Sequence, residues 1–123
     1  MLLVAMAFAG CHRDGLTHEQ RAVRHTATEA IEAIMEGRYA DFVEDIAYVD
    51  EMNDSYRAEF ADVLADYIAS LNHRNGGITS VTAVADSIVS DEAQVFLLLQ
   101  FADSTSEEIA FPLVRRDEKW RIK

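Results

Sequence analysis

The sequence has one cysteine, one proline and no excess of basic residues, and these shortages exclude several readings. Cys11 has no second cysteine to pair with, so the chain forms no intrachain disulfide. The net charge is −11, from 22 acids against 11 bases. Such a surface repels phosphates, which excludes nucleic acid as an expected partner. Half of the residues are hydrophobic, which is enough for a core in the one domain that 123 residues predict.

Signatures of catalysis and of metal binding are also lacking. The sequence contains no glycine-rich phosphate loop, no Gly-x-Ser-x-Gly and no pair of Cys or His at metal-ligand spacing. The four histidines are scattered, at positions 12, 18, 25 and 73. We therefore expect no metal, no cofactor and no catalytic residue, and a non-enzymatic protein is favoured over an enzyme.

An apolar run without charge occupies residues 1–8. It is far below the roughly 18–20 residues that span a bilayer, but it matches the apolar core of a secretory signal. Ala9 and Gly10 then precede Cys11, as small residues do in a bacterial lipobox. In a lipobox, the small residues let the signal peptidase approach the backbone, and the cysteine thiol carries the lipid.

This pattern predicts a signal peptide over residues 1–10 and a lipidated tether over residues 11–16. No Lys or Arg precedes the run and Phe8 stands where Leu is usual, and a start codon assigned too far downstream would explain the missing bases. The alternative is an ordinary buried cysteine. Because two acyl chains give stable anchoring, we expect a bacterial cell-envelope protein attached to the membrane at Cys11. The absence of Asp directly after Cys11 favours the outer membrane.

Helical periodicity dominates residues 17–72. Thr17 and Gln20 fit a capping box, and the apolar stripe that follows ends at Gly37, a residue that favours a helix stop. A short second helix and a long third helix over residues 55–72 are expected next. A stripe of alanines on the third helix is expected to pack on the first helix, with a subunit contact as the alternative; it comprises Ala58, Ala61, Ala65 and Ala69.

After the glycine turn at residues 76 and 77, the period changes to two, which predicts strands. The central strand covers residues 93–101, and both of its faces are apolar, with Leu97 on one and Phe96 on the other. A bend or bulge is expected at Asp86-Ser87. Pro112 cannot donate a ladder hydrogen bond, so an edge or a bulge is expected there. Helices followed by an antiparallel meander give an α+β fold.

The order of these elements resembles the nuclear-transport-factor-2-like (cystatin-like) superfamily, and in particular its small bacterial lipoproteins, some of which are labelled lumazine-binding-like. The matching stretches are Ser90-Asp-Glu-Ala-Gln-Val95 and residues 114–122, within a resemblance that covers about residues 18–123. It implies a single cystatin-like cone over residues 17–123, in which N-terminal helices pack on a curved antiparallel β-meander. Enzymes of this superfamily use a cavity Asp, Glu or His as base, and no residue here matches that role.

Six side chains are candidates for lining a cavity in such a cone. Three are tyrosines at helical positions that are expected to face the core, where a buried hydroxyl needs a hydrogen-bond partner. The others come from the strands. The six are Tyr39, Tyr56, Tyr67, Gln100, Phe101 and Trp120.

Three functions stay open from the sequence. The first is a lipid-anchored envelope protein whose cone binds a small apolar ligand or another envelope protein without catalysis. The second is a small isomerase or dehydratase, with Asp86 and Gln100 as the polar candidates near the core. The third is a structural module that forms a homodimer through the sheet face that the helices leave uncovered.

Overall fold

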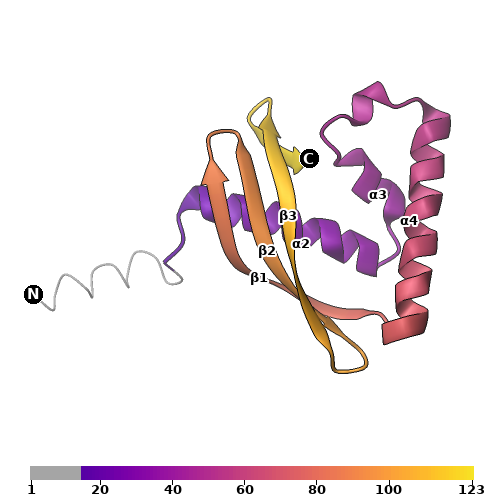
Figure 1. The fold of residues 1–123 in the computed structure, drawn as a ribbon. Helices are drawn as coiled ribbons and strands as arrows, with labels where there is room; N and C mark the ends of the chain where they lie inside the picture. The colour runs from indigo at the N-terminus through magenta and orange to yellow at the C-terminus, as the bar shows by residue number, and fades with distance from the viewer. Residues whose placement is uncertain (1–14) are drawn as a thin grey trace, which may run out of the picture.

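The computed structural model describes residues 15–123, so the predicted signal peptide, Cys11 and most of the tether lie outside the described residues. The helices come first in the chain and the strands second, as the sequence predicts (Figure 1). The elements are α2 (His18–Met35), α3 (Tyr39–Glu44), the 3-10 turn η1 (Val49–Glu51), α4 (Asp54–Asn75), β1 (Ile78–Val89), β2 (Glu92–Phe101), β3 (Ser106–Arg116) and β4 (Lys119–Ile122).

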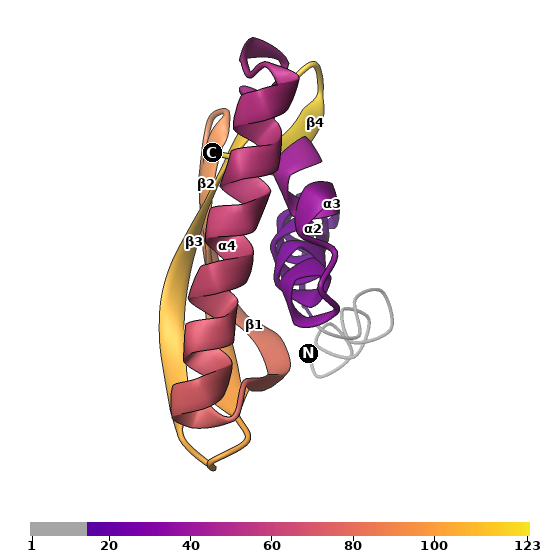
Figure 2. The same ribbon diagram turned by 90° about the vertical axis from the view of Figure 1, so that its right-hand side faces the viewer.

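The four strands form one antiparallel meander in the order β1-β2-β3-β4. β2 pairs with β1 on one side and β3 on the other, so its predicted central position is confirmed. Leu97 on its inner face is fully buried, whereas Phe96 and Leu98 on its outer face are half-buried. The helices therefore cover one face of the sheet, and Figure 2 shows α2 and α3 together on one side of the strands.

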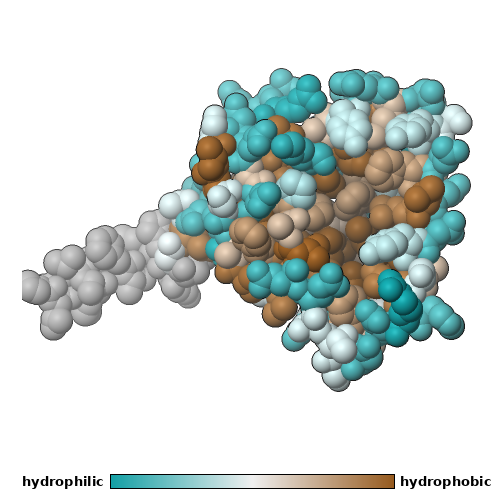
Figure 3. All heavy atoms as spheres, viewed as in Figure 1, coloured by the Kyte–Doolittle hydropathy of each residue, from teal (hydrophilic) through white to brown (hydrophobic). Residues whose placement is uncertain are grey.

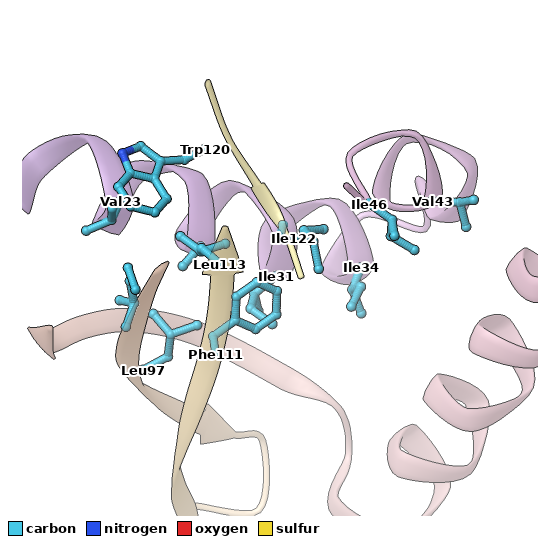
Figure 4. Packing of buried hydrophobic residues seen from close by; sticks show 14 of the residues in the cluster. Val23, Ile31, Ile34, Val43, Ile46, Leu97, Phe111, Leu113, Trp120 and Ile122 are labelled. Atoms are coloured by element: carbon cyan, nitrogen blue, oxygen red, sulfur yellow. The ribbon is translucent and has the colours of Figure 1, made fainter. Parts of the chain in front are cut away.

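The helix that fills the inner face of the sheet is α2. The predicted capping box at its start is confirmed, since Thr17 accepts from the Gln20 backbone and Gln20 reaches back to the Thr17 N–H. Val23 on α2 is fully buried, as are Leu97 of β2 and Leu113 of β3 (Figure 4). Burial of a side chain of this size contributes about 1.5–3 kcal/mol, so these three residues contribute substantially to the stability of the domain.

Local irregularities shape the strands, and the first is a register shift of β1 against β2 between Ile78 and Ser80. The pairing of β1 with β2 shifts register between Ala83 and Ala85, which leaves Val84 as the bulged residue, two residues before the predicted bend. As a result, Asp86 pairs opposite the buried Val95 and faces the helices. Pro112 lies just outside the part of β3 that β4 covers, so the predicted edge is found there.

α4 is placed differently from the sequence-based expectation. It packs on α3, and Ile68 is its only buried residue. The alanine stripe does not form the expected contact with α2, because Ala58 and Ala69 are exposed. α4 thus stands at the side of the cone instead of closing it (Figure 1).

The C-terminal end of α4 is fixed to the sheet. Gly76 ends the helix with a φ of 80°, and a Cβ at this position would lie 2.8 Å from the Cβ of Ala102. The Ala102 N–H donates to the carbonyl of Gly77, and the Asp103 N–H donates to that of Asn75. These contacts hold one end of α4 against the β2–β3 turn.

Candidate functional site

An apolar recess of about 140 Å³ opens between α4 and the sheet, at the end where α4 leads into β1. In Figure 3, hydrophobic side chains gather in the hollow between the strands and α4. The lining comprises Ile31, Ile34, Tyr67, Ile68, Leu71, Ile78, Leu99, Phe101, Glu107 and Ile109.

Each wall of the recess follows from the periodicity of its element. Ile31 and Ile34 lie one turn apart near the end of α2. Leu99 and Phe101 alternate along β2 and so share its inner face. Ile31 and Ile34 belong to the apolar stripe of the first predicted helix, and nothing in their spacing signals that α4 leaves one side of them open.

Polar groups are scarce in the recess. Among the described residues that line it, Tyr67 carries the one hydroxyl and Glu107 the one carboxylate. Both residues are exposed, so they lie at the rim. The lining contains no Ser, Thr, Cys or His. The recess is therefore suited to holding an apolar group and offers little for proton transfer.

A second hollow, of about 250 Å³, lies along α4 beside Tyr56, Glu59, Phe60 and Val63. The rings of Tyr56 and Phe60 meet edge to face, with centroids 6.3 Å apart. Tyr67 lies one turn beyond Val63 on the same helix face and also lines the recess. An apolar track thus runs along α4 and into the recess.

Two of the six predicted cavity residues, Tyr67 and Phe101, line the recess together. Tyr39 lies close by, in a neighbouring hollow that it shares with Ile34 and Ile68. The expectation that the helical tyrosines face the core does not hold for Tyr56 and Tyr67, which are 49% and 58% exposed. The physical reason is the position of α4, whose apolar stripe has no element packed over it.

Gln100 and Trp120 lie away from the recess. The exposed Gln100 points to the outer face of the sheet and accepts a hydrogen bond of 2.7 Å from the Ser80 hydroxyl. Trp120 is buried in the core, with the Arg115 guanidinium 5.1 Å above its ring. Neither residue can contribute to a ligand site between α4 and the sheet.

Asp86, the other polar candidate, is engaged by α2. Its side chain is 3% exposed, and its two oxygens accept from Arg24 Nε at 2.6 Å and from Gln20 Nε2 at 3.2 Å. It lies opposite Val95, six residues along β2 from Phe101, which corresponds to about 20 Å. Asp86 therefore anchors α2 to β1 and is remote from the recess.

The basic residues near the C-terminus are also used within the domain. Arg115 contacts Glu19 at 2.7 Å and Asp91 at 3.0 Å, and the hydrogen bond to Asp91 is the largest cause of its raised pKa. Arg121 donates to the carbonyls of Glu44 and Ile46, which tethers β4 to the end of α3. These contacts hold the core closed at the end opposite the recess.

Residues 15–123 contain no group of three or more His, Cys, Asp or Glu side chains that could hold a metal ion. None of the helices in this part of the chain is long and apolar enough to cross a membrane.

No protein-family model matches the sequence, and no curated protein matches it either. Among solved structures, the chain is similar to a proposed NTF2-like transpeptidase from Campylobacter jejuni, with a TM-score of 0.62 and 18% sequence identity. The match covers 78% of this chain and 92% of that chain. Likeness at this identity concerns the fold alone: the chain has the α+β fold of NTF2-like proteins, with helices packed on an antiparallel meander.

Proposed function

We propose that this protein is a lipid-anchored module of the bacterial cell envelope whose NTF2-like domain binds an apolar group, without catalysis. The observation that carries the binding role is the recess between α4 and the sheet, whose walls are aliphatic and aromatic. Ligand sites are commonly concave and largely apolar, with few polar groups.

The volume of the recess limits what it can hold. At about 140 Å³ it is close to an apolar cavity of roughly 150 Å³ that takes up benzene in another protein. The ligand class is therefore a single aromatic ring, a short branched acyl group, or an apolar side chain of a partner protein. Tyr67 and Glu107 are exposed at the rim, so the recess is open to solvent there and the rest of a larger ligand extends outside it.

Catalysis would need chemical groups placed inside the recess. An isomerase or dehydratase needs a positioned acid or base, but Glu107, the one carboxylate of the lining, is exposed at the rim, and Asp86 is held by Arg24 far from the recess. The similar Campylobacter jejuni protein is described as a transpeptidase, and acyl transfer commonly proceeds through a Ser, Cys or Thr nucleophile. Because the described lining residues include none of these, binding is the better supported role.

The outer face of the sheet remains a second candidate surface. Val84 is 45% exposed there, and Phe96 and Leu98 are half-buried. Exposed Gln94 and Gln100 interrupt this apolar area. A homodimer through this face stays a prediction. We favour binding in the recess over it, because the two glutamines interrupt the apolar area.

The recess is expected to bind toluene, and Ile109→Thr should weaken this binding about fivefold. The substitution replaces the ethyl group of the side chain with a hydroxyl in the wall of the recess, which lowers the binding free energy by about 1 kcal/mol. Saturation-transfer NMR on the folded chain measures the affinity.

Ile88→Thr is the matched control for this experiment. Ile88 is also a half-buried strand isoleucine, and it faces the helices opposite Ala93, away from the recess. Equal weakening by the two variants, or no toluene binding at all, would contradict the binding role.

The lipid anchor is expected to depend on Cys11, which lies outside the described residues. Its support is the sequence at Ala9-Gly10-Cys11. Radiolabelled palmitate should enter the full chain in a bacterial host, with a basic leader supplied, and Cys11→Ser should abolish the label. Persistent labelling of Cys11→Ser, or none in the parent, would remove the anchor from the proposal.

A further inference from the structure

The exposed face of α4 that runs beside the recess carries a row of large apolar side chains. Tyr56, Val63 and Tyr67 are 49%, 62% and 58% exposed. With the half-buried Phe60, they recur at intervals of three and four residues and so form one stripe, about 16 Å long. Monomeric proteins seldom leave such a contiguous stripe without a partner.

Acidic residues border this stripe. Glu59, Asp62 and Asp66 are exposed, and helical geometry places them on the side of the stripe opposite the buried Ile68. Within residues 15–123, none of the three acids forms an ion pair. The stripe therefore lies between the domain and an uncompensated row of negative charge.

The nearest basic residue on α4 is used elsewhere. Arg57 contacts Glu44 at 3.2 Å and donates to the carbonyls of Val49 and Met52, which ties the start of α4 to η1. Arg74 lies about two turns beyond Asp66, in the last turn of the helix. Neither Arg57 nor Arg74 pairs with the negative row, which is therefore open to a cationic partner from outside the domain.

The charges beside the stripe indicate which kind of partner binds this face of α4. A second copy packed antiparallel and face to face would set its acidic row against Glu59, Asp62 and Asp66, and like charges in contact are unfavourable. An anionic membrane surface would repel them as well. A basic amphipathic helix matches both the stripe and the row of acids, because its apolar face contacts the stripe and its Lys or Arg residues pair with the acids.

We propose that the exposed face of α4 binds a cationic amphipathic helix of a partner protein, one of whose apolar side chains enters the recess beside Tyr67. This deepens the proposed function and rests on it, since the partner's side chain is then the apolar group that the recess holds. The acids orient the helix, and the stripe supplies the contact area.

The test uses two labelled amphipathic peptides, one of Leu and Lys and one of Leu and Glu, in fluorescence anisotropy titrations with the chain. The Leu/Lys peptide should bind and the Leu/Glu peptide should not. The variant Glu59→Gln/Asp62→Asn/Asp66→Asn should bind the Leu/Lys peptide at least about threefold more weakly, from three surface ion pairs lost. Added salt should weaken binding by the parent more than by this variant.

Two controls separate the site from general attraction to an acidic protein. Glu32→Gln/Glu108→Gln/Glu118→Gln removes the same charge at exposed positions on other faces and should leave most of the affinity. Val63→Ser should weaken binding with no change in charge. Equal losses for the two triple variants, or full affinity in Val63→Ser, would overturn the proposal.

Three further outcomes are decisive. A dimer of the chain that dissociates in Val63→Ser during sedimentation would assign the face to a second copy and overturn the proposal. Toluene binding without any binding of the Leu/Lys peptide would also overturn it, while leaving the proposed function standing. Loss of toluene binding would instead count against the proposed function itself.

Discussion

Replacing Leu97 with aspartate is expected to unfold the domain. Leu97 is fully buried at the centre of β2, between Ala83 of β1 and Ile109 of β3. Losing a buried leucine side chain costs about 2–5 kcal/mol, and the unpaired carboxylate adds a further cost in an apolar site. The sum reaches the net stability of a small domain, about 5–15 kcal/mol. Circular dichroism melts measure the effect.

Gln94→Asp is the control for this substitution. Gln94 lies on the same strand but is exposed on the outer face, so a new charge there stays in water. We expect its melting curve to remain cooperative and close to that of the parent. Similar melts for the two variants would contradict the assignment of the inner face of β2 as the core.

Asp86→Ala is expected to destabilise the domain by about 3 kcal/mol. Removing one partner of a buried ion pair costs about 3–5 kcal/mol, because the other charge is left without compensation. Arg24 keeps 21% of its side chain exposed, so it reaches some water and we expect the lower end of that range. Urea denaturation followed by circular dichroism gives the free energy of unfolding.

The double variant Arg24→Met/Asp86→Ala separates the ion pair from the effect of lost volume. It leaves no uncompensated charge, so it should be more stable than Asp86→Ala alone. The single variant Arg24→Met completes the comparison. If the changes in the free energy of unfolding of the two single variants add up to that of the double variant, Arg24 and Asp86 are not coupled, and the account of how α2 is anchored to β1 fails.

The features that were predicted from the sequence are mostly local ones. The capping box at Thr17 and the central strand each depend on neighbouring residues, and both are found. The turn at Gly76 follows the same logic, because a φ of 80° favours glycine. Local geometry of this kind is determined by short stretches of sequence.

The position of α4 could not be predicted in the same way. Its apolar stripe gives the periodicity of a core-facing helix, and periodicity shows that a face is apolar without showing what covers it. The exposure of Tyr56 and Tyr67, and with it the open recess, depends on where α4 lies against α3 and the β2–β3 turn, which are contacts between segments far apart in the sequence. The bulge at Val84, which turns Asp86 inward, likewise arises from pairing with β2.

The isoleucines of this chain provide the most direct test of binding in the recess. The sequence contains eight, and five line the recess: Ile31, Ile34, Ile68, Ile78 and Ile109. Ile46, Ile88 and Ile122 do not line it. Isotope labelling of isoleucine methyl groups therefore reports on the site and on an internal control in one spectrum.

The measurement is a titration of the methyl-labelled chain with toluene, followed by two-dimensional NMR. We predict saturable shifts for the five recess methyl groups and fixed positions for the other three. Shifts centred on Ile46, Ile88 or Ile122, or a spectrum that toluene leaves unchanged, would contradict the claim that the space between α4 and the sheet is a binding site.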